Sequence, residues 1–311
     1  MLDRVTGMQV FSRVAALGSL SAAARALGMS QTMVTKHIAA IEERLGVRLL
    51  HRTTRKLTLT QAGRRYLESA ERILDDIEEA EATAAAERVE ARGTLRVNAP
   101  LSFGIRHIAP MMAEFARRHP AVLMDLGLSD RFVDLVEEGW DLAIRIGRMQ
   151  DSSMMARRLA PCRMVVCASP DYLAEHGRPA TVRDLAGHNC LSYTLSRMQS
   201  GGRWLFGQDA RVSVPVSGNL RSNNGDALVA AALAGQGLIY EPTFLVSDAL
   251  RDGRLIVVEL DVPFIELPGI YALHSASRLP PAKVRTFIEF LGQRFGGVPP
   301  WDRSLPPASG S

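Results

Sequence analysis

Cysteine is scarce in this sequence, and long hydrophobic runs are missing. The 311 residues include only three cysteines, an odd number whose spacing is not that of a metal site. No apolar stretch approaches the roughly 20 residues that cross a bilayer. The first residues lead into an amphipathic helix and not into the apolar core of a signal peptide. We therefore expect a cytoplasmic protein.

Motifs of common enzyme classes are also missing. The sequence has no Gly-x-Ser-x-Gly nucleophile elbow, no Gly-x4-Gly-Lys-Ser/Thr phosphate loop and no His-Glu-x-x-His zinc motif. Its seven histidines are scattered, and the pair His176 and His188 is too loosely spaced for a metal site. We expect no enzyme, no metal and no cofactor. A secreted solute-binding protein is an alternative, but it would need a signal peptide.

Positive charge is concentrated at the N-terminus, although the whole chain carries a net charge of only +4. Residues 1–60 hold nine lysines or arginines and three acids, whereas residues 61–92 hold five basic residues and nine acids. A local excess of basic side chains is what a polyanion such as DNA requires. The charge pattern therefore favours nucleic-acid binding by the first 60 residues.

The same N-terminal stretch predicts two helices joined by a tight turn. Over residues 31–45 the apolar positions 34, 38, 41 and 45 form one face of a helix, with Ser30 as N-cap and Gly46 as C-terminal stop. A shorter helix over residues 22–27, capped by Ser21 and ended by Gly28, precedes it. Two helices with such a turn are typical of a helix-turn-helix. Residues 2–17 predict a further helix that packs against both.

The outward face of the second helix carries polar side chains that can reach base edges and phosphates in a major groove. Residues 49–59 predict a short hairpin, or wing, because Leu57 and Leu59 alternate with polar neighbours. Gln31, Thr32 and Thr35 are expected to read bases, and Lys36, Arg52 and Arg55 to contact phosphate or the minor groove. The full set of predicted DNA contacts is Ser30, Gln31, Thr32, Thr35, Lys36, His37, Arg52, Thr53 and Arg55. A bundle that serves only packing or protein contacts would leave the basic charge unexplained.

A long helix is predicted from residue 61 to about residue 90, with Thr60 as its cap. Leu67, Ala70, Leu74 and Ile77 form a narrow apolar seam on it. Such an exposed helix is not stable alone, so its seam requires a partner, either a second subunit or the following domain of the same chain. Residues 91–93 form a hinge.

Beyond the hinge, strands alternate with helices, which predicts an α/β domain. We expect domain boundaries at 1–60, 61–92 and 93–295. The α/β part is expected to form two lobes, the first from residues 93–161 and 266–295 and the second from 162–265. Residues 296–311, with two Pro-Pro pairs and small residues, predict a disordered tail.

A set of residues spread over the first 63 positions forms one recognisable pattern. Its members are Phe11, Ala22–Ala24, Leu27, Ser30, Gln31, Val34, Thr35, Ile38, Ile41, Glu42, Leu45, Gly46, Leu49, Arg52, Leu59, Thr60, Ala62 and Gly63. This pattern closely resembles the winged helix-turn-helix of LysR-type transcriptional regulators. A run Asp-Leu-Ala-Ile-Arg at residues 141–145 and the order of elements extend the resemblance to about residue 295.

The resemblance implies an all-α winged helix-turn-helix and a linker helix, followed by a two-lobed α/β effector domain like a periplasmic binding protein. It implies binding to a double-stranded DNA operator, pairing into a homodimer or homotetramer through the linker helix and effector domain, and control by a small-molecule effector between the lobes. A carboxylate-bearing or aromatic metabolite is expected as effector. These roles fit a regulator and not an enzyme.

The effector is expected outside the carboxyl ends of strands, where helix N-termini offer free N–H groups. The candidate contacts are Leu101, Ser102, Phe103, Arg145, Asn223 and Asn224, with Ser129, Tyr193, Glu241 and Thr243 as lesser candidates. Ser102 has an alternative role as a helix cap, Asn223 as a turn residue, and Arg145 as a structural partner of Asp141 or Asp130. For Cys162, Cys167 and Cys190, buried thiols and a redox switch both remain open.

Overall fold

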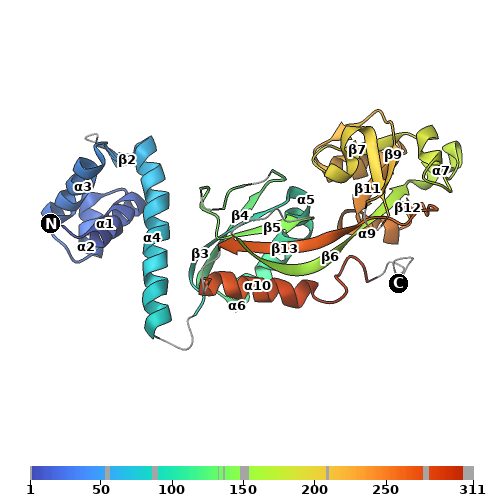
Figure 1. Cartoon of the computed structure of the whole chain (residues 1–311). Helices are drawn as coiled ribbons and strands as arrows, with labels where there is room; N and C mark the ends of the chain where they lie inside the picture. The colour runs from blue at the N-terminus through green and yellow to red at the C-terminus, as the bar shows by residue number, and fades with distance from the viewer. Residues whose placement is uncertain are drawn as a thin grey trace. The chain divides into compact units, whose positions relative to one another are not determined.

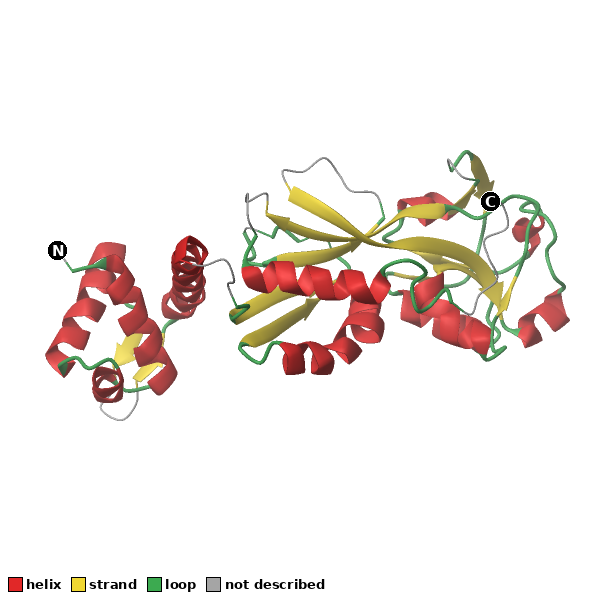
Figure 2. Ribbon diagram, turned by 90° about the horizontal axis from the view of Figure 1, so that it is seen from below, coloured by secondary structure: helices red, strands yellow, loops and turns green. Residues whose placement is uncertain are grey.

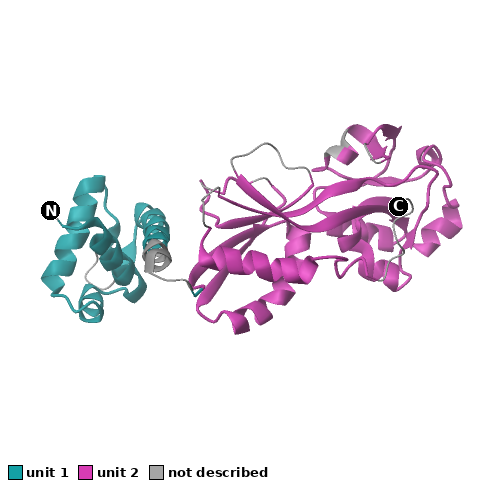
Figure 3. Ribbon diagram, turned by 60° about the horizontal axis from the view of Figure 1, so that its bottom comes forward, with its two compact units in different colours: residues 1–90 teal, residues 91–311 magenta. Residues whose placement is uncertain are grey.

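The computed structural model divides the chain into two compact units, Met1–Glu90 and Ala91–Ser311 (Figure 3). It describes residues 2–52, 57–85, 90–131, 133–135, 137–147, 154–207, 210–275 and 280–303, with all their side chains except those of residues 52, 75, 78–85, 197 and 200. Within these ranges, none of the helices is both long and apolar enough to cross a membrane.

Three helices pack around the core of the first unit (Figure 1). They are α1 (Arg4–Leu17), α2 (Leu20–Ala26) and α3 (Gln31–Leu45). The predicted cap of α3 is confirmed, because the Ser30 side chain accepts a hydrogen bond from the Met33 N–H and Gly46 adopts a φ of 68°. The predicted cap of α2 is wrong. Ser19, two residues earlier than predicted, accepts from the Ala22 N–H, so α2 begins at Leu20.

The predicted wing is confirmed as the antiparallel pair β1 (Leu50–Arg52) and β2 (Leu57–Leu59). Thr60 fastens it, because its hydroxyl donates to the Arg48 carbonyl at 2.8 Å and accepts from the Gly63 N–H at 2.9 Å. A Cβ atom at Gly63 would lie 2.1 Å from the Leu49 carbonyl oxygen, so only glycine fits this close approach. The predicted contacts at the wing tip, Thr53 and Arg55, lie outside the described residues.

The long helix α4 (Gln61–Ala85) belongs to the same unit. The first part of its predicted seam packs on the three-helix core, where Ala70 is fully buried and Leu67 is partly buried. The ring of Tyr66 meets that of Phe11 edge-on, with ring centroids 5.3 Å apart. The partner of this end of the seam is α1 of the same unit.

The second unit is built on a nine-stranded mixed sheet with the strand order β10-β7-β11-β6-β13-β5-β3-β4, in which β12 also pairs with β6. Two groups of parallel strands lie at its ends: β3, β4 and β5 in what we call lobe I, and β7, β10 and β11 in lobe II. The bounds are β3 (Gly93–Ala99), β4 (Val122–Leu128), β5 (Leu142–Ile146), β6 (Met154–Ala168), β7 (Cys190–Tyr193), β10 (Arg221–Ser222), β11 (Leu238–Pro242), β12 (Ile256–Val257) and β13 (Glu266–Ser275).

Two antiparallel strands, β6 and β13, connect the lobes (Figure 1). The first part of β6 pairs with β13, and residues 164–167 pair with β11. Lobe II also contains the hairpin β8 (Arg203–Phe206) and β9 (Val212–Pro215).

Helices lie against the faces of this sheet (Figure 2). They are α5 (Leu101–Phe103), the π-helix Gly104–Ile108, the 3-10 turn Ala109–Met111, α6 (Met112–Arg118), α7 (Pro170–His176), the 3-10 turns Asp184–Gly187 and Arg197–Gly202, α8 (Gly225–Leu233), α9 (Thr243–Arg251) and α10 (Ala282–Phe295). The sequence predicts a loop at residues 100–104 and a helix from residue 105. The helix instead begins at Leu101, directly after Pro100, whose fixed φ suits a position just before a first helical turn.

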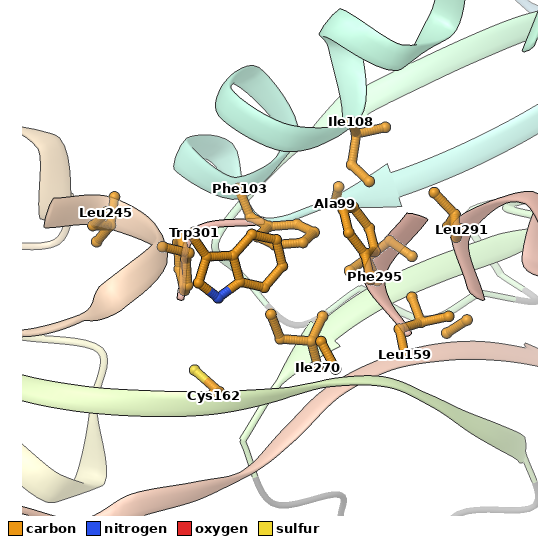
Figure 4. Close-up of a cluster of buried hydrophobic side chains, with 14 of the residues drawn as sticks. Ala99, Phe103, Ile108, Leu159, Cys162, Leu245, Ile270, Leu291, Phe295 and Trp301 are labelled. Atoms are coloured by element: carbon orange, nitrogen blue, oxygen red, sulfur yellow. The ribbon is translucent and has the colours of Figure 1, made fainter. Parts of the chain in front are cut away.

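The prediction that residues 296–311 are disordered is wrong for residues 296–303. Trp301 is only 2% exposed, and its ring lies 5.3 Å from that of Phe295 and 5.6 Å from that of Phe103 (Figure 4). One large aromatic side chain gains enough apolar burial to order a turn that composition alone would leave loose. Residues 304–311 lie outside the described part of the chain.

Replacing Trp301 by alanine should therefore destabilise the second unit. We expect Trp301→Ala to lower the free energy of unfolding by about 3–5 kcal/mol, because it leaves a cavity among aromatic rings. Val298→Ala is the matched control, since Val298 is 59% exposed and should change stability by less than about 0.5 kcal/mol. Urea unfolding of the full chain measures both, and equal effects of the two changes would contradict the burial of Trp301.

Candidate functional site

The polar face predicted to contact DNA is exposed at the start of α3. Gln31, Thr32 and Lys36 are exposed, and no described contact engages their side chains. Thr35 is half-buried, and its hydroxyl donates to the Gln31 carbonyl at 2.9 Å. Ser30 uses its hydroxyl to cap the helix at 3.2 Å from the Met33 nitrogen. A polar N-terminal half of a helix is the part that recognition helices place in a major groove.

His37 does not belong to this face, although the sequence analysis placed it there. It is 4% exposed and faces α1, where a Cβ atom at Gly7 would lie 3.9 Å from the His37 Nδ1 atom. His37 follows Val34 by three residues and precedes Ile41 by four, which is the spacing of the buried face. The imidazole therefore packs in the core of the unit and is not available to DNA.

The predicted wing contacts stay predictions. Arg52 ends β1, but its side chain lies outside the described set, as do Thr53 and Arg55 as whole residues.

Sequence reasoning missed the residue that fastens the wing to α3. The Glu42 carboxylate is 5% exposed and accepts the N–H groups of Leu49 at 2.9 Å and Leu50 at 3.2 Å, together with the Arg48 guanidinium at 2.8 Å. Burial alone would raise the pKa of Glu42, but these three donors outweigh it and lower the pKa. The signal in the sequence was a glutamate beside Ile41 on the buried side of the helix.

In the second unit, the carboxyl ends of the parallel strands of the two lobes face each other. Asp130 follows β4 in lobe I and Tyr193 ends β7 in lobe II. Burial raises the pKa of the Tyr193 phenol, and the carboxylates of Asp130 and Glu241 contribute to the same shift. Arg106 of the π-helix reaches across to Asp226 in α8, with Nε and Nη2 lying 2.9 Å and 2.6 Å from Oδ1. His107 Nε2 lies 3.0 Å from the Phe244 carbonyl oxygen.

Some of the predicted effector contacts lie next to these strand ends in lobe I. Leu101 donates its N–H to Asp130 Oδ1 at 3.0 Å, and Ser102 lies in the first helical turn with 7% exposure. Ser102 is not the helix cap that was its alternative role, since Pro100 holds that position. Ser129 accepts a hydrogen bond from the Arg131 N–H at 3.1 Å.

On the lobe II side, the two predicted asparagines have different positions. Asn224 caps α8 by accepting the Ala227 N–H at 3.1 Å, and Asn223 is exposed. Glu241 and Thr243 are buried at the end of β11 and the start of α9.

Phe103 belongs to the hydrophobic core and not to an open site. It is fully buried, and its ring lies 5.3 Å from Phe244 and 5.6 Å from Trp301 (Figure 4). The start of the helix at Leu101 turns Phe103 towards this aromatic cluster. The prediction that Phe103 contacts the effector is therefore wrong.

Arg145 has structural partners, and Asp130, one of the two acids that the sequence suggested, acts on it through its charge. Burial lowers the pKa of Arg145, and the carboxylates of Glu138 and Asp130 oppose that shift. The Nη1 atom of Arg145 donates to Asn98 Oδ1 at 2.8 Å and to the Ile144 carbonyl at 2.9 Å. Asp141 instead accepts the Arg96 N–H at 2.8 Å and pairs with Lys283 at 3.3 Å.

Two carboxyl groups near these strand ends have raised pKa values. Burial, with a smaller contribution from the nearby Asp226, raises the pKa of Glu241 to about 8. Burial also raises the pKa of Asp130, with a smaller contribution from Asp226. Sequence reasoning missed Arg106 and Asp226, because their ion pair joins residues far apart in the chain.

Histidines, cysteines and acids are the residue types that could hold a metal ion, and cysteine can also act as a nucleophile. No group of three or more histidines, cysteines or acids in the described residues could hold a metal ion. All three cysteines are buried, and burial raises the pKa of each thiol, which disfavours the reactive thiolate. The structure therefore supports buried thiols over a redox switch.

Glu241→Gln should change how stability depends on pH. The folded protein keeps the Glu241 proton up to about pH 8, whereas the unfolded chain loses it near 4.5, so this group destabilises the wild type progressively between these values. We expect the variant to gain about 1.4 kcal/mol relative to wild type per pH unit in that window. Chemical unfolding at several pH values measures the difference. The exposed Glu175→Gln control should show none, and a pH-independent difference would contradict the buried neutral carboxyl.

Thiol labelling provides a separate check on the cysteines. In native buffer at pH 8, Cys162, Cys167 and Cys190 should react with a disulfide reagent far more slowly than in urea, where all three become accessible. A thiol that reacts in the native protein as fast as in urea would overturn their structural role.

Both parts of the chain match known protein families. Residues 5–64 match the family described as bacterial regulatory helix-turn-helix protein, lysR family, and residues 88–296 match the LysR substrate binding domain. The chain is 32% identical over 289 residues to the HTH-type transcriptional regulator CrgA of Neisseria meningitidis serogroup B, covering 93% of this chain and 96% of that protein. It is 35% identical over 295 residues to the regulator DmlR of Escherichia coli K12, covering 94% and 95%.

Solved structures show the same fold. The structure of CrgA from Neisseria meningitidis, described as a LysR-type transcriptional regulator, matches with a TM-score of 0.61 and 32% identity, covering 96% of this chain and 100% of that one. Full-length AphB, the Vibrio cholerae virulence activator, matches with a TM-score of 0.57 and 28% identity, covering 94% and 100%. The relatives are named transcriptional regulators and not enzymes. The chain belongs to the LysR family of transcriptional regulators, with an N-terminal helix-turn-helix domain and a C-terminal effector-binding domain.

Proposed function

We propose that α3 recognises operator DNA through Gln31, Thr32 and Thr35, and that Lys36, Arg52 and Arg55 contact phosphates or the minor groove. The observation that carries this proposal is the exposed polar face at the N-terminal end of α3, in the most basic part of the chain. Base edges require donors and acceptors of this size, and phosphates require basic side chains. The capped start of α3 holds the face in a defined position.

The effector site is proposed at the facing strand ends of the two lobes. Leu101, Ser102 and Ser129 would line it from lobe I, and Asn223, Asn224 and Glu241 from lobe II. The supporting observation is the set of polar contacts between the lobes at this place, above all the Arg106–Asp226 ion pair. A ligand that binds one arrangement of the lobes more tightly than another would shift their equilibrium.

Pairing of two copies is proposed through α4 and the effector domain, giving a homodimer or homotetramer. Along α4, Ile73 is 41% exposed, and Leu74 and Ile77 are half-buried beyond the part of the seam that packs on α1. Two helix-turn-helix units must be held together to read two half-sites. Since its partner is operator DNA, we place the protein in the cytoplasm.

A mobility-shift titration with three variants tests the DNA-binding surface. Gln31→Ala should cost about 1–3 kcal/mol on the operator and relax specificity at one base pair, because it removes a base contact. Lys36→Ala should weaken binding to all sequences and reduce the salt slope by about 1. Arg183→Ala removes one positive charge from an exposed position of the second unit and should leave operator affinity unchanged. If Gln31→Ala and Lys36→Ala both matched Arg183→Ala, α3 would not be the recognition helix.

A further inference from the structure

The segment that joins α3 to the wing lies between the two elements that are proposed to contact DNA. Helix α3 ends at Leu45 and β1 begins at Leu50, so residues 46–49 connect them. This joining segment and the second half of α3 line one recess, whose residues are Ala39, Glu42, Glu43, Gly46, Val47 and Arg48. The recess therefore borders both DNA-contacting elements.

The recess lies on the same side of α3 as the polar face. Thr32 precedes Lys36 by four residues, and Ala39 and Glu43 follow at intervals of three and four, which is the spacing of neighbours along one side of a helix. All four side chains are exposed. A duplex that contacts Thr32 and Lys36 therefore extends towards Ala39 and the recess.

One strand of the DNA has to pass this place. A single sugar-phosphate backbone separates a major groove from the minor groove next to it. If α3 occupies the major groove and the wing reaches the adjoining phosphates or minor groove, that backbone runs past the joining segment. Phosphates are bound by basic side chains or by N–H groups. The N–H groups of Leu49 and Leu50 already donate to Glu42, and the basic residue that lines the recess is Arg48.

Arg48 is both exposed to solvent and held in position. Its side chain is 79% exposed, although its Nη1 atom donates to Glu42 Oε2 at 2.8 Å. Its backbone is fixed as well, because its carbonyl accepts the Thr60 hydroxyl at 2.8 Å. A guanidinium has several more N–H donors than the contact to Glu42 uses, so it can bind a phosphate at the same time. A side chain that is already held loses less conformational entropy when it binds.

Glu42 is the positioning residue for Arg48. The Glu42 carboxylate is 5% exposed, and its Oε1 atom accepts the two backbone N–H groups while Oε2 accepts Arg48. Burial acts to raise the pKa of Glu42, but these hydrogen bonds and the charge of Arg48 lower it, so the carboxylate is ionised at neutral pH. Since the negative charge is compensated within the protein, Glu42 can hold the guanidinium without strongly repelling a phosphate.

We propose that Arg48 binds a phosphate of the DNA backbone where this backbone passes between α3 and the wing, and that Glu42 holds the guanidinium in place. The proposal rests on the proposed docking of α3 and the wing, and it adds a contact that sequence reasoning did not identify. The exposed Glu43 lines the same recess, so its charge acts on the same phosphate with the opposite sign.

The test measures binding of the full-length protein to a random-sequence duplex and to the DNA beside its own gene, across a salt series. Arg48→Ala should weaken binding to both about tenfold and reduce the salt slope by about 1. Arg48→Lys keeps the charge and should keep the slope. Glu43→Gln should strengthen binding to both, because it removes a negative charge beside the phosphate. The control Arg183→Ala, at an exposed position of the second unit, should bind as wild type does.

Urea unfolding of the same variants separates a DNA contact from a structural role. An ion pair with one partner this exposed contributes little stability, so Arg48→Ala should unfold close to the wild-type urea concentration. Weaker DNA binding without loss of stability, restored in part by Arg48→Lys, would support the phosphate contact. An unchanged salt slope in Arg48→Ala, or weaker binding by Glu43→Gln, would overturn it.

Lys36→Ala in the same titration distinguishes failure of this proposal from failure of the proposed docking. If Lys36→Ala weakens binding and Arg48→Ala does not, α3 keeps its role and Arg48 does not contact DNA. If neither variant changes binding, both the docking of α3 and the contact of Arg48 are wrong. An effect of Arg48→Ala on one DNA sequence and not on the other would also contradict a phosphate contact, since phosphates are the same in every sequence.

Discussion

The pairing of β6 with β13 is the constraint on which the effector domain depends. These two antiparallel strands run between the lobes, and β6 pairs with β13 along its first part and with β11 beyond it. Both lobes contain part of this pair of strands. The pair therefore places the carboxyl ends of the parallel strands of one lobe opposite those of the other. Trp301, near the C-terminus, contacts both lobes: its ring packs against Phe103 of lobe I and against Phe244 of lobe II.

The contacts between the lobes differ in strength, which matters for regulation. The aromatic cluster around Trp301 is buried, whereas the Arg106–Asp226 pair is about one-third exposed on both sides. A partly solvated ion pair contributes little stability and is easily exchanged for another partner. The polar side of the junction can therefore respond to a ligand while the apolar side keeps the lobes joined.

Local sequence signals predicted local structure well, and contacts between distant residues were not predictable. Ser30 and Gly46 gave the bounds of α3, because capping depends on neighbours within one turn. His37 was predicted to contact DNA because its side chain is polar, although its position lies on the buried face of α3. The Arg106–Asp226 pair and the burial of Trp301 depend on partners more than a hundred residues away, and a single sequence contains no signal for them. Composition at residues 296–303 pointed to disorder for the same reason.

We propose that paired copies of α3 bind two DNA half-sites. A nuclease footprint of the full-length protein on the DNA beside its own gene, taken across a salt series, tests this pairing. We expect two protected half-sites separated by one or more helical turns, with affinity that falls steeply as salt increases. A single protected half-site, or no sequence-selective protection anywhere on that DNA, would contradict it.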